Sequence, residues 1–136
     1  MCKVNSSLYV ERTPHISREC TGTTHWIPNT DVYVTEEALV IKVELAGMRR
    51  EDLELAYEGS RLFISGQRPD GCRAPGCKFL VMEIDYGSFE CVIDIPAGYK
   101  LGDAVAGYQN GFLRIDIPKA PRSSSKIISV SSSESK

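Results

Sequence analysis

The sequence predicts an all-β protein, in which one antiparallel β-sandwich lies between an N-terminal arm and a C-terminal tail. Apolar residues recur at every second position in several short segments, and glycine- and proline-containing turns separate these segments. No segment has the period of an amphipathic helix. With 136 residues, of which 42% are hydrophobic, the chain is long enough to bury one core of ordinary size.

The clearest predicted strand covers residues 39–45, where apolar side chains alternate with Lys42 and Glu44. The same alternation predicts further strands over residues 53–57, 89–95 and 113–117, and shorter ones over 31–35 and 62–65. Turn signals separate the strands at Ala46-Gly47, Glu58-Gly59-Ser60, Ile95-Pro96-Ala97-Gly98 and Asn110-Gly111. Short strands separated in this way are typical of a sandwich.

Composition divides the chain into three parts. Residues 1–26 have no sustained hydrophobic period and are predicted to form the arm. Residues 27–119 are the predicted domain, which is acidic: 9 basic and 15 acidic residues lie between positions 27 and 118. Residues 120–136 are predicted to be a flexible, serine-rich tail, because such a segment buries too little apolar surface to offset its ordering entropy.

Charge and hydropathy argue against several classes of partner. The formal net charge of −2 gives no electrostatic reason to expect nucleic acid or an anionic membrane. No apolar run approaches the roughly 20 residues that cross a bilayer, and the first residues lack the apolar segment of a signal peptide. We therefore expect no membrane span and a cytoplasmic protein.

No pattern in the domain predicts catalysis, a cofactor or a metal site. Catalysis needs a positioned base, and both histidines, His15 and His25, fall in the arm. They have the ordinary titration range of a pH sensor, but solvated side chains are the simpler interpretation. We expect a protein that is not an enzyme.

The five cysteines are an odd number without framework spacing, which fits reduced thiols. Cys72 and Cys77 lie in an irregular insert at residues 68–78, where a zinc site or a regulatory disulfide is conceivable. Free thiols are the expected state, because a zinc site would need a second pair of ligands. Cys91 follows the apolar alternation of its strand and is expected in the core or an interface.

Six motifs occur in order through the predicted domain. They are IPNTDVY (27–33), LAGMRREDL (45–53), LFISG (62–66), YGSF (86–89), IP (95–96) and NGFLRIDIPK (110–119). The set resembles the α-crystallin domain of small heat-shock proteins, the α-crystallin/Hsp20 family, in its bacterial and plant form. Ile128-Ser129-Val130 in the tail is similar to the family's C-terminal I-x-I/V motif. The resemblance implies an immunoglobulin-like sandwich.

The resemblance also implies homodimers that assemble into higher oligomers. In bacterial and plant members, the loop after the third motif carries an extra strand that pairs with the partner's sheet edge. Here that dimerisation loop would be residues 67–86, with its strand at residues 79–84. Its candidate contact residues are Phe79, Val81, Ile84 and Tyr86.

For the tail, the resemblance implies that Ile128 and Val130 enter a groove on a neighbouring subunit. An extended tail places both side chains on the same side. By position, the groove is expected between the strand at residues 53–57 and the segment at 104–108. Its candidate residues are Leu53, Leu55, Ala104, Ala106 and Tyr108. The alternative is that Ile128 and Val130 are unrelated apolar residues of a solubilising tail.

As a function, the resemblance implies a stress-response chaperone that holds unfolding client proteins without ATP, and the chain has no GxxxxGK[ST] phosphate-binding motif. Candidate client-binding residues in the arm are Val4, Leu8, Tyr9, Val10, Ile16 and Trp26. The competing hypothesis is an adaptor domain, like those of co-chaperones, that docks onto a folded partner. Cys91 lies where family members often have a basic residue, which puts any intersubunit ion pair there in doubt.

Overall fold

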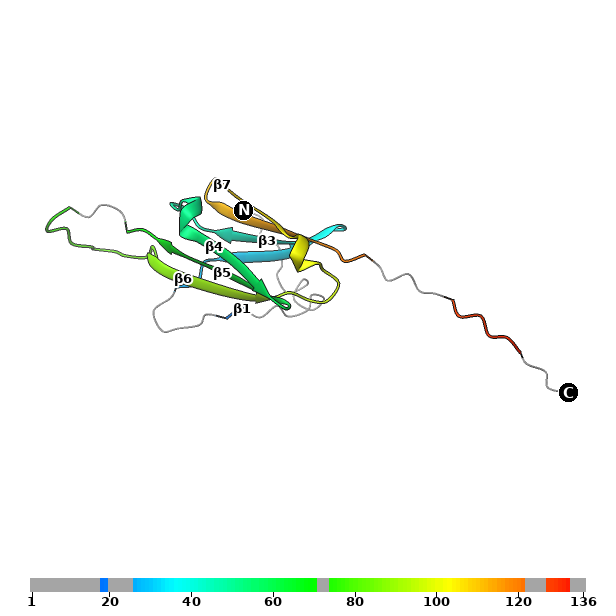
Figure 1. The fold of residues 1–136 in the computed structure, drawn as a ribbon. Helices are drawn as coiled ribbons and strands as arrows, with labels where there is room; N and C mark the ends of the chain where they lie inside the picture. The colour runs from blue at the N-terminus through cyan, green and yellow to red at the C-terminus, as the bar shows by residue number, and fades with distance from the viewer. Residues whose placement is uncertain (1–17, 20–25, 71–73, 122–126, 133–136) are drawn as a thin grey trace, which may run out of the picture.

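A computed structural model of the chain describes residues 18–19, 26–70, 74–121 and 127–132. In these residues, antiparallel strands form two sheets (Figure 1). The strands are β1 (Arg18–Glu19), β2 (Thr30–Val34), β3 (Ala38–Glu44), β4 (Leu53–Glu58), β5 (Arg61–Arg68), β6 (Gly87–Asp94), β7 (Val105–Gln109) and β8 (Phe112–Pro118). Two short 3-10 helices, η1 (Arg50–Asp52) and η2 (Leu101–Asp103), precede β4 and β7.

Sheet A has the strand order β1-β6-β5-β4, and sheet B has the order β2-β3-β8-β7. This antiparallel sandwich confirms the predicted fold class. Each strand predicted from alternation is present, with ends that differ by at most a few residues. The sequence did not indicate β1, which lies in the segment expected to be the arm. Residues 79–84 form no strand within the single chain, so their pairing with a partner stays a prediction.

The core lies between the sheets and follows from the two-residue period of the strands. Leu39 and Ile41 of β3 lie opposite Ile117 and Ile115 of β8, and all of them are buried. From sheet A, alternate residues of β5 and β6, including Phe89, pack against them. Burial of apolar side chains from both sheets is the main stabilising contribution to such a domain.

Two backbone positions show why particular residues are needed. Asn110 and Gly111 have positive φ angles of 53° and 83°, and they form the two-residue turn between β7 and β8. At Gly66, a Cβ atom would lie only 2.2 Å from the carbonyl oxygen of Asp52 and 2.9 Å from the ring of Phe89. Glycine at this position in β5 therefore leaves room for the backbone of η1 and the ring of Phe89.

The two ends of the sandwich carry different extensions (Figure 1). Residues 74–86 project beyond one end, before the chain returns as β6. The chain leaves the sandwich at the opposite end, where β8 ends near η2, and residues 127–132 lie beyond that end. Strands β4 and β7 are neighbouring edges of the two sheets, while β2 is the far edge of sheet B. The edges and extensions are therefore the surfaces that can meet a second chain.

Candidate functional site

A groove of about 400 Å³ lies where β4, the edge of sheet A, faces β7, the edge of sheet B. No backbone hydrogen-bond ladder joins these two strands, so a space remains between the sheets. The groove is lined by Arg50, Leu53, Leu55, Ala106, Gly107, Tyr108 and Leu113. Most of these side chains are apolar, so the groove can accept apolar side chains from an extended segment.

Hydrogen bonds hold one wall of the groove in place. The hydroxyl of Tyr108 donates to the carbonyl of Leu45 and accepts from the backbone N–H of Met48 at 3.3 Å. These bonds join β7 to the turn that leads from β3 into η1. At η1, Asp52 accepts from the backbone N–H of Arg49 at 3.2 Å and pairs with its guanidinium at 3.4 Å. The wall is therefore set before any ligand arrives.

Four of the groove residues named from the sequence, Leu53, Leu55, Ala106 and Tyr108, line the groove in the structure. Ala104 instead packs against the core, because it caps η2 and precedes β7. Sequence reasoning missed Arg50, Gly107 and Leu113. Leu113 could have been predicted, because the two-residue turn at Asn110-Gly111 places it opposite Tyr108, which was already a candidate.

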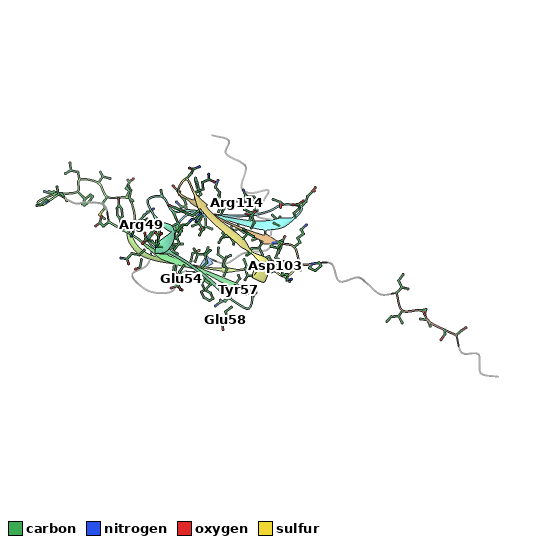
Figure 2. All side chains as sticks on the ribbon, turned by 45° about the horizontal axis from the view of Figure 1, so that its top comes forward. Arg49, Glu54, Tyr57, Glu58, Asp103 and Arg114 are labelled. Carbon is green, nitrogen blue, oxygen red and sulfur yellow. The ribbon has the colours of Figure 1, made fainter. Side chains whose placement is uncertain are left out.

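An ion pair lies near each end of the groove, Arg49–Asp52 at η1 and Lys100–Asp103 at η2. Figure 2 shows Arg49 near one end and Asp103, Tyr57 and Glu58 towards the other. Asp103 forms an exposed ion pair with Lys100 at 3.1 Å. Because these charges lie in solvent, they are screened and affect the approach of a ligand more than its affinity.

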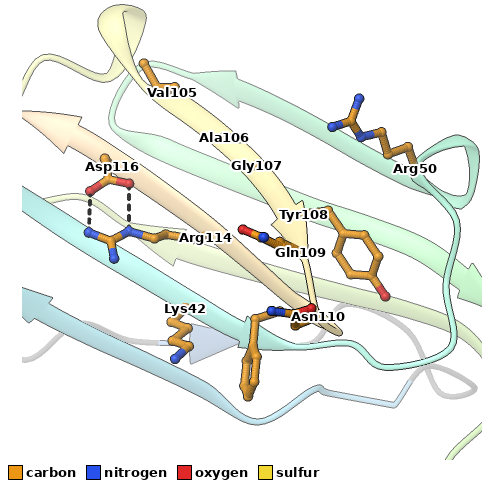
Figure 3. Close-up of a pocket in the computed structure, with 11 residues that line it drawn as sticks. Lys42, Arg50, Val105, Ala106, Gly107, Tyr108, Gln109, Asn110, Arg114 and Asp116 are labelled. Atoms are coloured by element: carbon orange, nitrogen blue, oxygen red, sulfur yellow. Dashed lines mark hydrogen bonds and ion pairs between the residues drawn. The ribbon is translucent and has the colours of Figure 1, made fainter.

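A second hollow, of about 890 Å³, lies across β7 on the outer face of sheet B (Figure 3). The guanidinium of Arg114 donates two hydrogen bonds of 3.0 Å to the carboxylate of Asp116, and these bonds raise the pKa of Arg114 above its ordinary value. The ammonium of Lys42 lies 4.3 Å from the centre of the Phe112 ring. These two cations already have partners within the chain.

The predicted dimerisation loop presents a run of exposed apolar side chains. Phe79, Val81 and Ile84 are exposed, whereas Tyr86, at the end of the loop, is half-buried. Leu80, at 90% exposure, and Met82 add to the same surface and were not among the candidate contact residues. An exposed apolar run of this kind is typical of an interaction surface.

The tail motif is also exposed. Ile128 and Val130 are 85% and 94% exposed, and the neighbouring Ile127 is 96% exposed. Of the arm candidates, Val4, Leu8, Tyr9, Val10 and Ile16 lie outside the described residues, as do both histidines and Cys72. Trp26 is half-buried, and its ring packs against Phe89 with 5.3 Å between the centroids. It is therefore part of the domain's packing.

Other chemistry has little support in the described part of the chain. Cys77 is exposed in the loop and Cys91 is buried in the core, as the alternation of β6 predicts. Among the described residues, histidine, cysteine and acidic side chains form no group of three or more that could hold a metal ion. The same residues include no helix with the length and apolar composition required to span a membrane.

Comparison with known proteins gives a consistent result. The profile of the Hsp20/alpha crystallin family matches residues 31–131. The chain is similar to spore protein SP21 of Stigmatella aurantiaca, with 32% identity over 112 residues, which are 82% of this chain and 66% of that protein. It is also similar to heat shock protein 16 of Schizosaccharomyces pombe, with 28% identity over 122 residues, covering 87% of this chain and 82% of that one. The chain thus spans just under two thirds of the spore protein.

Solved structures show the same likeness. A small heat-shock protein from Xylella fastidiosa superposes with a TM-score of 0.69 and 26% identity, covering 80% of this chain and all of that one. Heat shock protein 16.0 from Schizosaccharomyces pombe gives a TM-score of 0.62 and 27% identity, with 79% of this chain and 78% of that one covered. The two-sheet sandwich described above is common to them.

Proposed function

This chain belongs to the Hsp20/alpha-crystallin family of small heat-shock proteins, a family of chaperones and not of enzymes, and we propose that it is an ATP-independent holdase. In this role it binds unfolding proteins in the cytoplasm and prevents their aggregation. It acts as homodimers that assemble into higher oligomers.

The observation that carries the proposal is the match between the open groove and the exposed tail motif. The groove is lined by leucine, alanine and tyrosine side chains. Ile128 and Val130 lie on one side of an extended segment, and both are exposed. Burial of both side chains contributes about 3 to 6 kcal/mol before the cost of ordering the tail. A contact of that strength is reversible, so heating releases the groove.

The dimer is supported by an open edge and an exposed apolar segment. In the single chain, β2 pairs with β3 on one side only, and Tyr33 and Val34 are exposed on it. We propose that residues 79–84 of one subunit pair with β2 of the other. Such pairing satisfies the backbone groups of the edge and covers the apolar run, which removes two aggregation hazards at once.

Clients are expected to bind through apolar surface that assembly hides and heating releases. The vacated groove and the apolar residues of the arm are the proposed binding surfaces. Unfolding proteins expose complementary apolar segments, and binding them requires no nucleotide hydrolysis.

The test is the aggregation of a heat-labile client enzyme, followed by light scattering with and without this chain. The buffer contains reduced thiols and no ATP, and an equal mass of an unrelated stable protein serves as the control. Suppression of scattering at near-equimolar ratios is the expected result. A folded chain that leaves the scattering unchanged would contradict the holdase and favour an adaptor that binds one folded partner.

A further inference from the structure

Arg68 joins the two ends of the predicted dimerisation loop. It is the last residue of β5 and lies at the start of the loop of residues 67–86. Its Nε donates to the carbonyl of Asp85, at the far end of the loop, at 2.7 Å. One terminal nitrogen reaches the carbonyl of Ala46 at 3.4 Å, in the turn that follows Leu45. A charged donor on a backbone carbonyl forms a stronger hydrogen bond than a neutral one, so these contacts hold the neck of the loop.

Two aromatic rings lie against the same guanidinium. The guanidinium carbon of Arg68 is 4.2 Å from the centre of the Trp26 ring and 5.7 Å from that of Tyr86. Tyr86 ends the loop, whereas Trp26 belongs to the segment that enters the domain from the arm. The cation therefore connects the loop to the N-terminal segment through cation–π contacts.

Trp26 is itself fixed to the strand that follows the loop. Its indole N–H donates to the carbonyl of Gly87 at 3.0 Å, and its backbone N–H donates to Ser88 at 3.3 Å. Further along the same strand, β1 pairs with β6 through Arg18 opposite Ile93 and Glu19 opposite Val92. The N-terminal segment is thus attached at two places to β6: Trp26 lies next to the end of the loop, and β1 pairs with the opposite end of the strand.

We propose that Arg68 and Trp26 are positioning residues for dimerisation: they form a clamp that fixes both ends of the loop and couples the N-terminal segment to the dimer interface. The inference rests on the proposed strand exchange through residues 79–84. A loop whose ends are fixed loses less conformational entropy on docking, so the clamp strengthens the dimer without contacting the partner. Coupling is reciprocal, so docking of the loop also stabilises the position of Trp26.

The experiment compares full-length variants by sedimentation over a concentration series that includes the monomer–dimer step. Arg68→Gln removes the cation, Arg68→Lys keeps the charge but not the planar fork, and Trp26→Phe keeps a ring without the indole donor. The matched control is Arg61→Gln, at the other end of β5, where Arg61 contacts Asp94 at 3.0 Å. Circular dichroism establishes that each variant is folded.

We expect Arg68→Gln to raise the dimer dissociation constant about tenfold, with smaller increases for Arg68→Lys and Trp26→Phe and none for Arg61→Gln. Equal constants for Arg68→Gln and Arg61→Gln would overturn the clamp while leaving the dimer intact. A wild-type chain that stays monomeric at every concentration would instead overturn the proposed assembly, and the clamp with it.

A spectroscopic measurement separates positioning from simple stabilisation of the fold. Trp26 is the single tryptophan of the chain, so intrinsic fluorescence reports directly on the clamp. On dilution through the dimer dissociation range, the emission of the wild-type chain should shift, and that of Arg68→Gln should already resemble the monomer at high concentration. Emission that does not change as dimers dissociate would contradict the coupling.

Discussion

The neck of the dimerisation loop and the groove between β4 and β7 lie at two junctions of the same sandwich and are built differently. At the neck, Arg68 contacts backbone carbonyls and two aromatic rings of its own chain. In the groove, Leu55 and Ala106 are exposed, and Leu53 and Tyr108 are half-buried. The first junction is satisfied by contacts within the chain, whereas the second leaves apolar side chains open to solvent. A domain that assembles needs both kinds: fixed geometry where a loop must be aimed, and open apolar surface where another chain must bind.

The largest expected effect comes from charging the exposed apolar run of the loop. The double change Val81→Asp and Ile84→Asp should abolish the dimer, because pairing would bury two carboxylates at an apolar contact. Sedimentation at the wild-type dimer concentration measures it, with a folded monomer as the expected species.

Lys78→Glu is the matched control for this double change. It alters the net charge of the same segment by the same amount, and it removes no apolar side chain. Loss of the dimer in both variants would show that overall charge, and not the apolar run, governs dimerisation, whereas a dimer that survives the double change would contradict the proposed pairing.

The next largest effect is expected in the tail. Ile128→Gly with Val130→Gly should reduce the higher oligomer to dimers, since about 3 to 6 kcal/mol of apolar burial is lost for each tail that docks. Light scattering coupled to size-exclusion chromatography gives the mass. Ile127→Gly is the control, because Ile127 is equally exposed but points to the other side of an extended tail. If Ile127→Gly reduced the mass and the double change did not, the proposal that Ile128 and Val130 are the side chains that enter the groove would be wrong.

A smaller effect should follow from loosening the groove wall. Tyr108→Phe removes the hydroxyl that bridges Leu45 and Met48, so two part-buried backbone groups lose their partner. The free energy of unfolding should fall by about 1 to 2 kcal/mol, measured by urea denaturation. Tyr57→Phe, on an exposed ring, is the control and should change stability by less than about 0.5 kcal/mol. Equal losses for the two variants would mean that the Tyr108 bridge adds nothing to the wall.

The fold was largely predictable because it depends on strand alternation, whereas the place of the groove was expected only from the family resemblance. In β3 and β8, the core residues recur at every second position, so the sequence alone predicts these strands, although Val40 between two core residues is buried as well. Four groove residues follow from the same alternation once β4 and β7 are taken as neighbouring edges. Ala104 does not, because a residue that caps a 3-10 helix has a direction set by the helix end and not by strand period.

The clamp could not be predicted in the same way. Trp26, Arg68 and Tyr86 are far apart in sequence, and a cation between two rings has no periodicity that marks it. The sequence places Trp26 among the apolar residues of the arm, because an aromatic residue outside the alternating segments has no pattern that assigns it to the core. Likewise β1 pairs through two residues only, too few to show any alternation. Contacts of this kind become visible only when the sheet order brings the segments together.

The smallest effect on stability and assembly is expected from changes on the outer face of sheet B. These changes test whether a surface whose charges pair within the chain differs from the open groove. Arg114 and Asp116 satisfy each other through two hydrogen bonds in full solvent, so Arg114→Gln should change neither the denaturation midpoint nor the oligomer mass measurably. Asp116→Asn, which breaks the same pair from the other side, should behave identically. A lower oligomer mass in either variant would show that the hollow over β7 is also an assembly surface. In that case, an ion pair formed within the chain would not mean that the surface around it lacks a role in assembly.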